Sequence, residues 1–136
     1  MFNDRYVYPA IFHYADDGIS IEFPDLPGCF SYGDTDIEAV ANAKEALELH
    51  LYGLEDDNED IPSPSHIRDM KHNDNESIIL IDVWMTPVRD FMLNKAIKKT
   101  LTIPKWLNDV ALENHVNFSQ LLQVAIKDYL GIHKNH

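Results

Sequence analysis

The sequence predicts an α+β protein, and three observations lead to this expectation. Segments rich in aromatic and β-branched residues precede one long stretch with helical spacing. A polar, acidic segment follows that stretch and leads into a nearly continuous apolar segment. Near the C-terminal end, a short alternating segment precedes a proline and two more stretches with helical spacing. The expected order is three strands, a helix and a strand, then a strand and two helices.

The first three strands are expected before residue 34. Residues 6–14 and 19–23 flank the turn sequence DDG at residues 16–18, which is typical of a hairpin. Residues 24–28 contain two prolines, which cannot donate to a strand ladder, and a glycine that permits a tight turn. Residues 29–32 are then long enough for a third strand.

A helix is expected next, across the three-stranded sheet. Thr35 and Glu38 fit a capping box at its start. Apolar residues then recur at spacings of three and four, which predicts a helix over residues 36–52 that ends near Gly53.

A long loop and a fourth strand complete the first part of the chain. Residues 55–77 are polar, acidic and contain prolines, so they are expected to form a surface loop. Residues 78–84 read IILIDVW, which predicts a strand buried on both faces. We therefore expect one domain over residues 1–86, a linker over 87–94 and a second domain over 95–136.

The second domain is expected to contain two helices. Pro104 can occupy the first turn of a helix over residues 105–114. Asn117 is a good N-cap for the last helix, and Gly131 is its expected stop. The apolar face of that last helix is expected to contain Leu121, Leu122, Ala125, Ile126 and Tyr129.

The alternating segment before Pro104 predicts a strand with two different faces. One face carries Lys98, Thr100 and Thr102, and the other carries Lys99, Leu101 and Ile103. The strand has no partner within a domain of this size, which is also too small for a sufficient core. We therefore expect two copies of the chain to pair these strands antiparallel about a two-fold axis, with the helices on the apolar side.

The charge is unevenly distributed along the chain. The formal net charge is −12, yet residues 1–93 carry five Lys and Arg against 20 Asp and Glu, while residues 94–136 carry six Lys against three acids. The first part therefore has a net charge of −15 and the second part of +3. This division predicts a basic partner for the first domain and an anionic partner for the second.

Several classes of protein do not fit the sequence. It has no apolar run long enough to span a bilayer and no signal-peptide pattern at its start, so a cytoplasmic protein is expected. Cys29 is the single cysteine and is expected to be a small buried hydrophobe, without a role as nucleophile or metal ligand.

Two stretches of the chain resemble known families. KKTLTIPKWLNDVALENHVNFSQLLQVAIKDYL (residues 98–130) resembles the ribbon-helix-helix fold of the Arc and MetJ repressors. AIFHYADDGISIEFPDLPGCFSYGDTDIEAVANAKEAL (residues 10–47) combines a hairpin, the sequence FPDLPGC and a GDT that opens an alanine-rich helix. Together they make nearly the whole chain, except the loop 55–77, similar to a HicB-type antitoxin of a type II toxin-antitoxin system.

This resemblance implies two binding activities and no catalysis. The N-terminal domain would be a degenerate RNase H-like domain that binds and occludes a HicA-type toxin, a small basic ribonuclease that cleaves mRNA. The C-terminal domain would form a homodimer, or a larger oligomer, and repress its own operon by binding operator DNA. No cofactor, metal ion or membrane is implied.

The resemblance also implies a set of DNA-binding residues. Lys98, Thr100 and Thr102 would enter the major groove, although Arg, Asn or Gln is frequent on such ribbons. The backbone amides of Asn117, Phe118 and Ser119 would hold a phosphate, because a helix N-terminus is an anion site. The chain departs from the family pattern at the turn between the helices, where His115 replaces a frequent glycine. Lys99 would lie on the inward face of the ribbon and extend its charge to an edge.

The candidate toxin-binding residues lie in the turn after the second strand. They are Asp25, Leu26, Pro27, Gly28 and Phe30. Turn formation alone explains these residue types equally well, because each has a local conformational role.

Two other functions are compatible with parts of the sequence. A ligand- or metal-responsive ribbon-helix-helix repressor without a toxin partner would use some of the seven histidines, which are scattered along the chain. A nuclease of the RNase H type would need converging carboxylates to hold two metal ions. The available carboxylates are Asp25, Asp34, Glu48 and Asp82.

Overall fold

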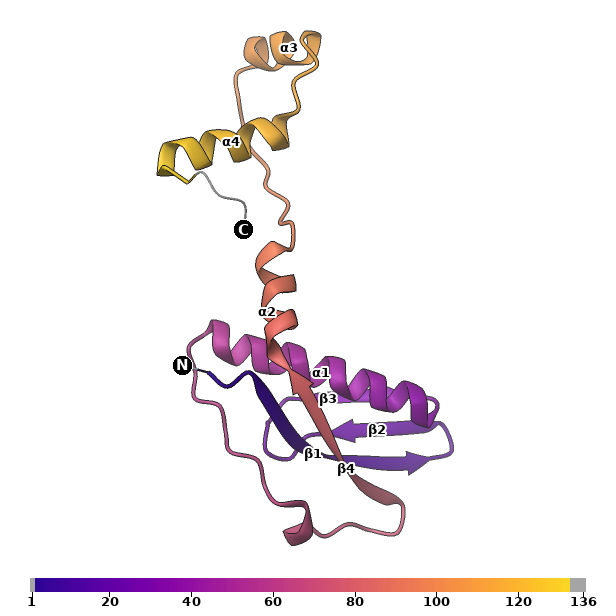
Figure 1. Ribbon diagram of the computed structural model, residues 1–136. Coiled ribbons are helices and arrows are strands. Elements are labelled where there is room, and N and C mark those ends of the chain that lie inside the picture. Colours follow the sequence, from indigo (N-terminus) through magenta and orange to yellow (C-terminus); the bar gives the residue numbers. More distant parts are fainter. Residues whose placement is uncertain (1, 133–136) are drawn as a thin grey trace. The chain divides into compact units, whose positions relative to one another are not determined.

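The chain forms two compact units in a computed structural model that describes residues 2–132 (Figure 1). We call the first unit the body (residues 2–93) and the second the tail (residues 94–132). Two of the seven histidines considered for a metal-responsive repressor, His133 and His136, lie outside the described residues. None of the described helices is long and apolar enough to cross a membrane.

The body contains one antiparallel sheet of four strands. These are β1 (Arg5–Ala15), β2 (Gly18–Glu22), β3 (Phe30–Gly33) and β4 (Glu76–Trp84), in the spatial order β3-β2-β1-β4. The predicted hairpin is confirmed, with Ala15 opposite Gly18 at the turn between β1 and β2. The last strand in sequence therefore lies at the edge of the sheet, beside the first.

Helix α1 (Asp36–Asp56) covers one face of this sheet (Figure 1). Its predicted cap is confirmed, because the Thr35 side chain accepts a hydrogen bond of 3.2 Å from the backbone amide of Glu38. The predicted end near Gly53 is wrong, since the helix continues to Asp56. Glycine is only moderately unfavourable inside a helix, and Leu54 in the added turn packs against the core.

The hydrophobic core lies between α1 and the sheet. Alternate residues of β1 and β2 face the buried side of α1, where Ala39, Ala43, Leu47 and Leu51 recur at four-residue spacing. Strand and helix approach closely at Gly33, where an added Cβ would lie 2.5 Å from the backbone of Ala39. The other buried apolar residues are Tyr8, Ala10, Phe12, Ile19, Ile21, Phe23, Leu26, Cys29, Ile81, Val83 and Met85.

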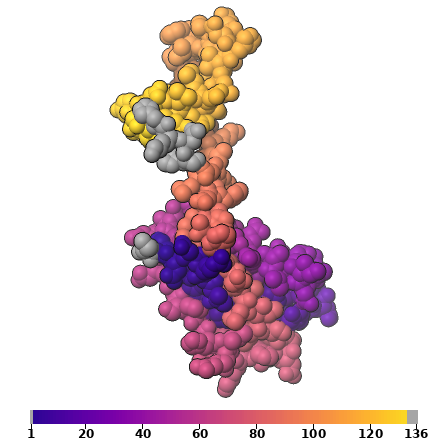
Figure 2. Space-filling model, in the orientation of Figure 1, coloured from indigo at the N-terminus to yellow at the C-terminus, as the bar shows by residue number. Residues whose placement is uncertain are grey.

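Strand β4 differs from the prediction of burial on both faces. Ile81 and Val83 face α1 and are buried, whereas Leu80 and Trp84 are each 49% exposed. Among the helices described for the body, α1 covers one face of this sheet, so the alternate residues of the edge strand β4 remain at the surface. The surface view shows β4 beside the indigo of β1 (Figure 2).

The predicted loop is shorter at both ends, because Glu55 belongs to α1 and residues 76–77 belong to β4. Its described course includes one 3-10 turn, Ile67–Asp69. The loop is anchored to the turn after β2, since Asp25 accepts hydrogen bonds from the Ser65 backbone amide and hydroxyl, at 2.9 and 2.6 Å.

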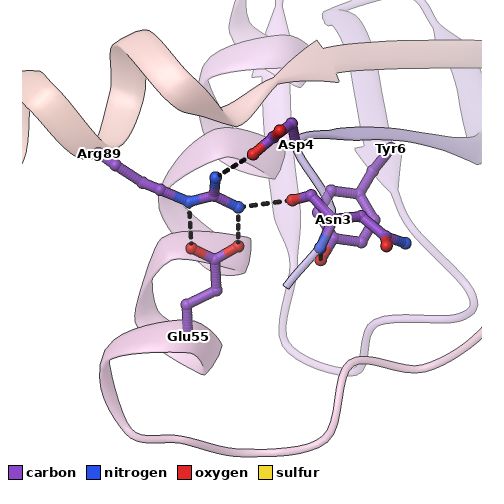
Figure 3. A network of polar contacts seen from close by, with 5 residues as sticks. All are labelled: Asn3, Asp4, Tyr6, Glu55 and Arg89. Carbon is purple, nitrogen blue, oxygen red and sulfur yellow. Dashed lines mark hydrogen bonds and ion pairs between the residues drawn. The ribbon is translucent and has the colours of Figure 1, made fainter. Parts of the chain in front are cut away.

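Residues 87–94, expected to be a linker, belong to helix α2 (Met85–Asn94), which follows β4 directly. Pro87 lies in its first turn, where a missing N–H breaks no helical hydrogen bond. Arg89 of α2 forms two 2.8 Å bonds to Glu55 at the end of α1 and one of 2.7 Å to Asp4 (Figure 3). These bonds raise the pKa of Arg89, with the Glu55 hydrogen bond as the main cause.

The tail contains two helices, α3 (Lys105–Glu113) and α4 (Phe118–Leu130). Both predicted ends of α4 are confirmed: the Asn117 side chain accepts from the Gln120 amide at 3.0 Å, and Gly131 is left-handed with φ 72°. Residues 95–104 form no strand with any described part of the chain. A β-ladder forms between two strands, and the expected partner of this segment belongs to a second chain. The two-stranded ribbon therefore remains a prediction.

Candidate functional site

An apolar groove of about 710 Å³ is formed within the tail. Leu101 and Ile103 line it from the segment before Pro104, together with the facing sides of α3 and α4. The contributing helix residues include Leu107, Val110, Ala111, Phe118, Leu121, Leu122 and Ala125. Of the apolar face predicted for α4, Ile126 and Tyr129 do not line this groove, and Tyr129 is 90% exposed.

The segment before Pro104 has two chemically different sides. Lys99, Leu101 and Ile103 line the groove, whereas Lys98, Thr100 and Thr102 do not. All six residues are exposed in the single chain. The alternation that the sequence predicts is therefore present in space: one side is mainly apolar and contributes to the groove, and the other offers an ammonium group and two hydroxyls.

No described residue of the tail is buried. Leu101 and Leu121 are each 57% exposed, and Val110 is 48% exposed. A folded unit in water normally removes such side chains from solvent, because each fully buried one contributes roughly 1.5–3 kcal/mol. The tail thus presents an apolar surface that its own residues do not cover.

The start of α4 has free backbone donors. The Asn117 side chain accepts a hydrogen bond from the amide of Gln120. No described group accepts a hydrogen bond from the amides of Phe118 and Ser119. Partial positive charge gathers at such an N-terminus. Phosphate binding by these amides, which the family resemblance implies, remains a prediction. The side chains of Phe118 and Ser119 also border the apolar groove.

The turn before α4 contains a strained residue. His115 adopts φ 56°, a left-handed conformation that is uncommon for residues other than glycine. Its amide donates to Leu112 at 3.1 Å, and the next amide, of Val116, donates to Ala111 at 3.0 Å. The turn is closed by these two bonds in the manner usual for a helix C-terminus, with histidine in the glycine position.

The predicted toxin-binding turn combines structural and exposed residues. Asp25 is hydrogen-bonded to Ser65, and Leu26 is only 1% exposed, so both shape the turn. Gly28 has φ 88°, which favours glycine. Pro27, Gly28 and Phe30 are exposed, and Phe30 is 66% exposed on the sheet face opposite α1. Three of the five candidates are thus accessible to a partner.

Cys29 is buried beside this turn. Burial raises the pKa of its thiol to about 11, so the thiol remains protonated at neutral pH. Its Sγ lies 3.7 Å from the carbonyl oxygen of Ala46, to which it can donate weakly. This environment fits the predicted role as a small hydrophobe.

The carboxylates that a nuclease would need do not converge. Asp25 is bound to Ser65, Asp34 accepts from the Tyr32 hydroxyl at 2.9 Å, and Asp82 projects from β4 at the sheet edge. Within residues 2–132, no group of three or more His, Cys, Asp or Glu side chains has an arrangement suited to a metal ion.

Sequence reasoning missed two polar clusters in the body. His13 on β1 contacts Glu22 on β2 at 2.8 Å and Glu76 at the start of β4 at 2.5 Å. The second cluster is the Arg89 network in Figure 3. Both clusters join residues from different elements. The His13 cluster could have been predicted only from the order of the strands, which places β2 and β4 on either side of β1.

Comparisons with known proteins agree on one family. The family model described as the HicB-like antitoxin of bacterial toxin-antitoxin systems matches residues 8–125. An uncharacterised 14.9 kDa protein from the rep-hol intergenic region of Haemophilus phage HP1 is 35% identical over 104 residues, which are 74% of this chain and 75% of that protein. Antitoxin HicB 2 of Photorhabdus laumondii is 38% identical over 58 residues, which are 43% of this chain and 42% of that antitoxin.

A solved structure extends the similarity to nearly the full chain. A protein chain in a toxin-antitoxin complex from Streptococcus pneumoniae is 29% identical, with a TM-score of 0.61. The match covers 92% of this chain and 99% of that one. Body and tail are therefore both present in a chain that was solved within such a complex.

Proposed function

The chain belongs to the HicB-like antitoxin family of bacterial toxin-antitoxin systems, and from this premise we propose that it binds and occludes a HicA-type mRNA interferase toxin and represses its own operon by binding operator DNA. The chain acts by binding and performs no chemistry itself. Its targets, an mRNA-cleaving toxin and an operator, are both cytoplasmic, so this is where we expect it to act.

The two-sided segment before Pro104 is the observation that carries the DNA-binding proposal. Leu101 and Ile103 contribute to the apolar groove, which leaves Lys98 and Thr100 free to contact DNA. In the proposed homodimer, the tails of two chains pair these segments as a two-stranded ribbon and cover each other's apolar surface. The uncovered apolar side chains of the single tail support this arrangement.

The body is the proposed toxin-binding domain. Its formal charge of −15 favours a strongly basic partner and disfavours nucleic acid. The exposed residues Pro27, Gly28 and Phe30 remain the candidates that the sequence provides. The body is also the part that we propose to have the degenerate RNase H-like fold.

Replacing Lys98 and Thr100 together by alanine tests the division of functions. The double variant is expected to weaken operator binding about tenfold or more, because one phosphate or base contact and one hydroxyl contact are lost in each chain. Fluorescence anisotropy with operator DNA measures this loss. The wild-type affinity should also fall steeply with salt concentration, since phosphate contacts release counterions.

A matched variant removes the same charge elsewhere on the tail. Lys105→Ala deletes an ammonium group that is paired with Asp109 at 2.7 Å, and it should change operator affinity much less. Both variants should still block RNA cleavage by the toxin. Loss of toxin inhibition in the double variant would contradict the division of functions, and wild-type protein that leaves RNA cleavage unchanged would contradict the antitoxin role.

A further inference from the structure

The outer edge of β4 has no partner in the body. In the order β3-β2-β1-β4, β4 pairs with β1 only. The 2.7 Å bond from the Met85 amide to the Asp4 carbonyl continues the ladder, so odd-numbered residues of β4 bond to β1. The N–H and C=O groups of even-numbered residues therefore point outward. For Leu80 and Asp82 these groups have no hydrogen-bond partner among residues 2–132.

This edge lacks the features that usually protect an edge strand. Residues 76–84 read ESIILIDVW, with no lysine, no proline and mainly apolar side chains of high β-propensity. The register with β1 is continuous from Glu76 to Trp84, so no bulge turns the edge away. A long regular edge of this kind is a template on which another strand can pair.

The side chains beside the edge form a small surface that we call the β4 patch. It consists of Val7, Leu80, Asp82 and Trp84; its β4 members alternate with the buried Ile81 and Val83. Trp84 also borders a hollow between α1 and α2. Its apolar members are between 45 and 49% exposed, and Asp82 lies between Leu80 and Trp84 and opposite Val7. At one end, the Arg5 guanidinium lies 5.0 Å from the centre of the Trp84 ring. Apolar contact area thus adjoins the free backbone groups, with a carboxylate in its middle.

Charge decides which strand fits this edge. Pairing β4 with β4 of a second copy would bring together two bodies that each carry −15, which electrostatic repulsion disfavours. A strand from a basic protein gains from the same field. We infer that the toxin binds by adding a strand to the free edge of β4, with its side chains on the β4 patch. This inference rests on the proposed function, and it assigns the toxin a site that the candidate turn does not include.

Amide hydrogen exchange tests the inference without any substitution. The probe is a catalytically inactive form of the cognate HicA-type toxin, added to the full chain. In the free chain, the amides of Leu80 and Asp82 should exchange rapidly, because they have no acceptor. In the complex their exchange should slow by at least about tenfold, because new backbone bonds protect them.

A pair of substitutions at Asp82 separates the backbone from the charge. Asp82→Asn removes the carboxylate and keeps the outward N–H, whereas Asp82→Pro also removes that N–H without breaking a bond to β1. Relative to Asp82→Asn, Asp82→Pro should raise the Kd for the toxin about tenfold or more, since the lost bond also prevents close approach of the added strand. Glu38→Lys is the control for a changed charge elsewhere, because Glu38 is exposed in the first turn of α1, next to Ala39, which packs on β3 at the opposite edge of the sheet. It should have a much smaller effect.

Circular dichroism and operator binding establish that each variant is folded. If Asp82→Pro does not fold, Leu80→Lys replaces it as the test variant, because it keeps the backbone N–H and places a cation opposite a cationic partner.

Toxin-induced protection found only in the turn 25–30 or in α1 would overturn the inference and leave the antitoxin role intact. Edge protection in the free chain that disappears on dilution would overturn it in favour of a second copy. A wild-type chain that does not bind the toxin would overturn both.

Discussion

At the scale of single residues, Arg89 has the most extensive set of polar contacts in the described body. It contacts Glu55 at the end of α1 with two nitrogens, Asp4 before β1, and the Asn3 carbonyl at 2.5 Å (Figure 3). The Glu55 side chain is only 7% exposed, whereas that of Asp4 is 71% exposed. The two carboxylates should therefore contribute very differently to stability, because solvent screens the exposed one.

Arg89→Ala should lower the free energy of unfolding by about 2 kcal/mol, because it leaves the nearly buried Glu55 carboxylate without its partner. Asp4→Asn is the matched control and should cost less than about 1 kcal/mol. Urea unfolding followed by Trp84 fluorescence, in a Trp106→Phe background, measures both effects in the body. Equal losses in the two variants would show that the exposed contact matters as much as the buried one.

At the scale of elements, two glycines affect the stability of α1 in opposite directions. Gly33 ends β3 where an added Cβ would lie 2.5 Å from the Ala39 backbone, and backbone atoms cannot move aside easily. Gly53 lies inside the last turns of α1, where an added Cβ would meet nothing within 4 Å. The first glycine permits the close packing of helix on sheet, while the second only weakens the helix.

The same substitution at these two positions should have opposite effects. Gly33→Ala should destabilise the body by about 2 kcal/mol through overpacking. Gly53→Ala should stabilise it by about 0.5–1 kcal/mol, because alanine favours the helix. Thermal unfolding of the two variants measures the difference. A destabilised Gly53→Ala variant would mean that α1 ends earlier than Asp56.

Local elements were predictable from the sequence, and pairings between distant segments were not. The hairpin turn at Gly18 and the caps at Thr35 and Asn117 depend on residues within a few positions of one another, so the sequence reveals them. Helix α2 was missed because Pro87 argues against a helix unless it falls in the first turn. The edge position of β4 depends on strand order, which leaves no local signal.

In the candidate site, too, local features were predictable from the sequence and long-range ones were not. The two sides of the segment before Pro104 were predictable from alternation alone, and Leu101 and Ile103 do line the groove. The prediction that β4 is buried on both faces was wrong, because an apolar run in the sequence does not reveal how many layers cover a sheet. Which residues meet a partner molecule depends on that partner, so it stays a proposal.

At the scale of the whole molecule, the two units differ in how completely they fold alone. The body has a buried core between α1 and its sheet. No described residue of the tail is buried, although α4 is capped at both ends. We therefore propose that the tail needs a second apolar surface, which a second tail provides.

Placing one acidic residue on either side of the ribbon segment tests this dependence. Leu101→Asp introduces a charge into the apolar groove and should convert the dimer to monomers in analytical ultracentrifugation. Thr100→Asp makes the same charge change one residue away on the other side. It should leave the dimer intact and abolish operator binding through repulsion of phosphates. Monomers in both variants would contradict the assignment of the two sides.

The absence of buried residues in the described tail has a consequence for the proposed repression of the operon. If tails become ordered only in pairs, we expect the amount of repressor to rise with the square of chain concentration while most chains are single. A modest fall in antitoxin supply would then relieve repression disproportionately. The body, which is complete in each chain, would still be available to hold the toxin during that interval.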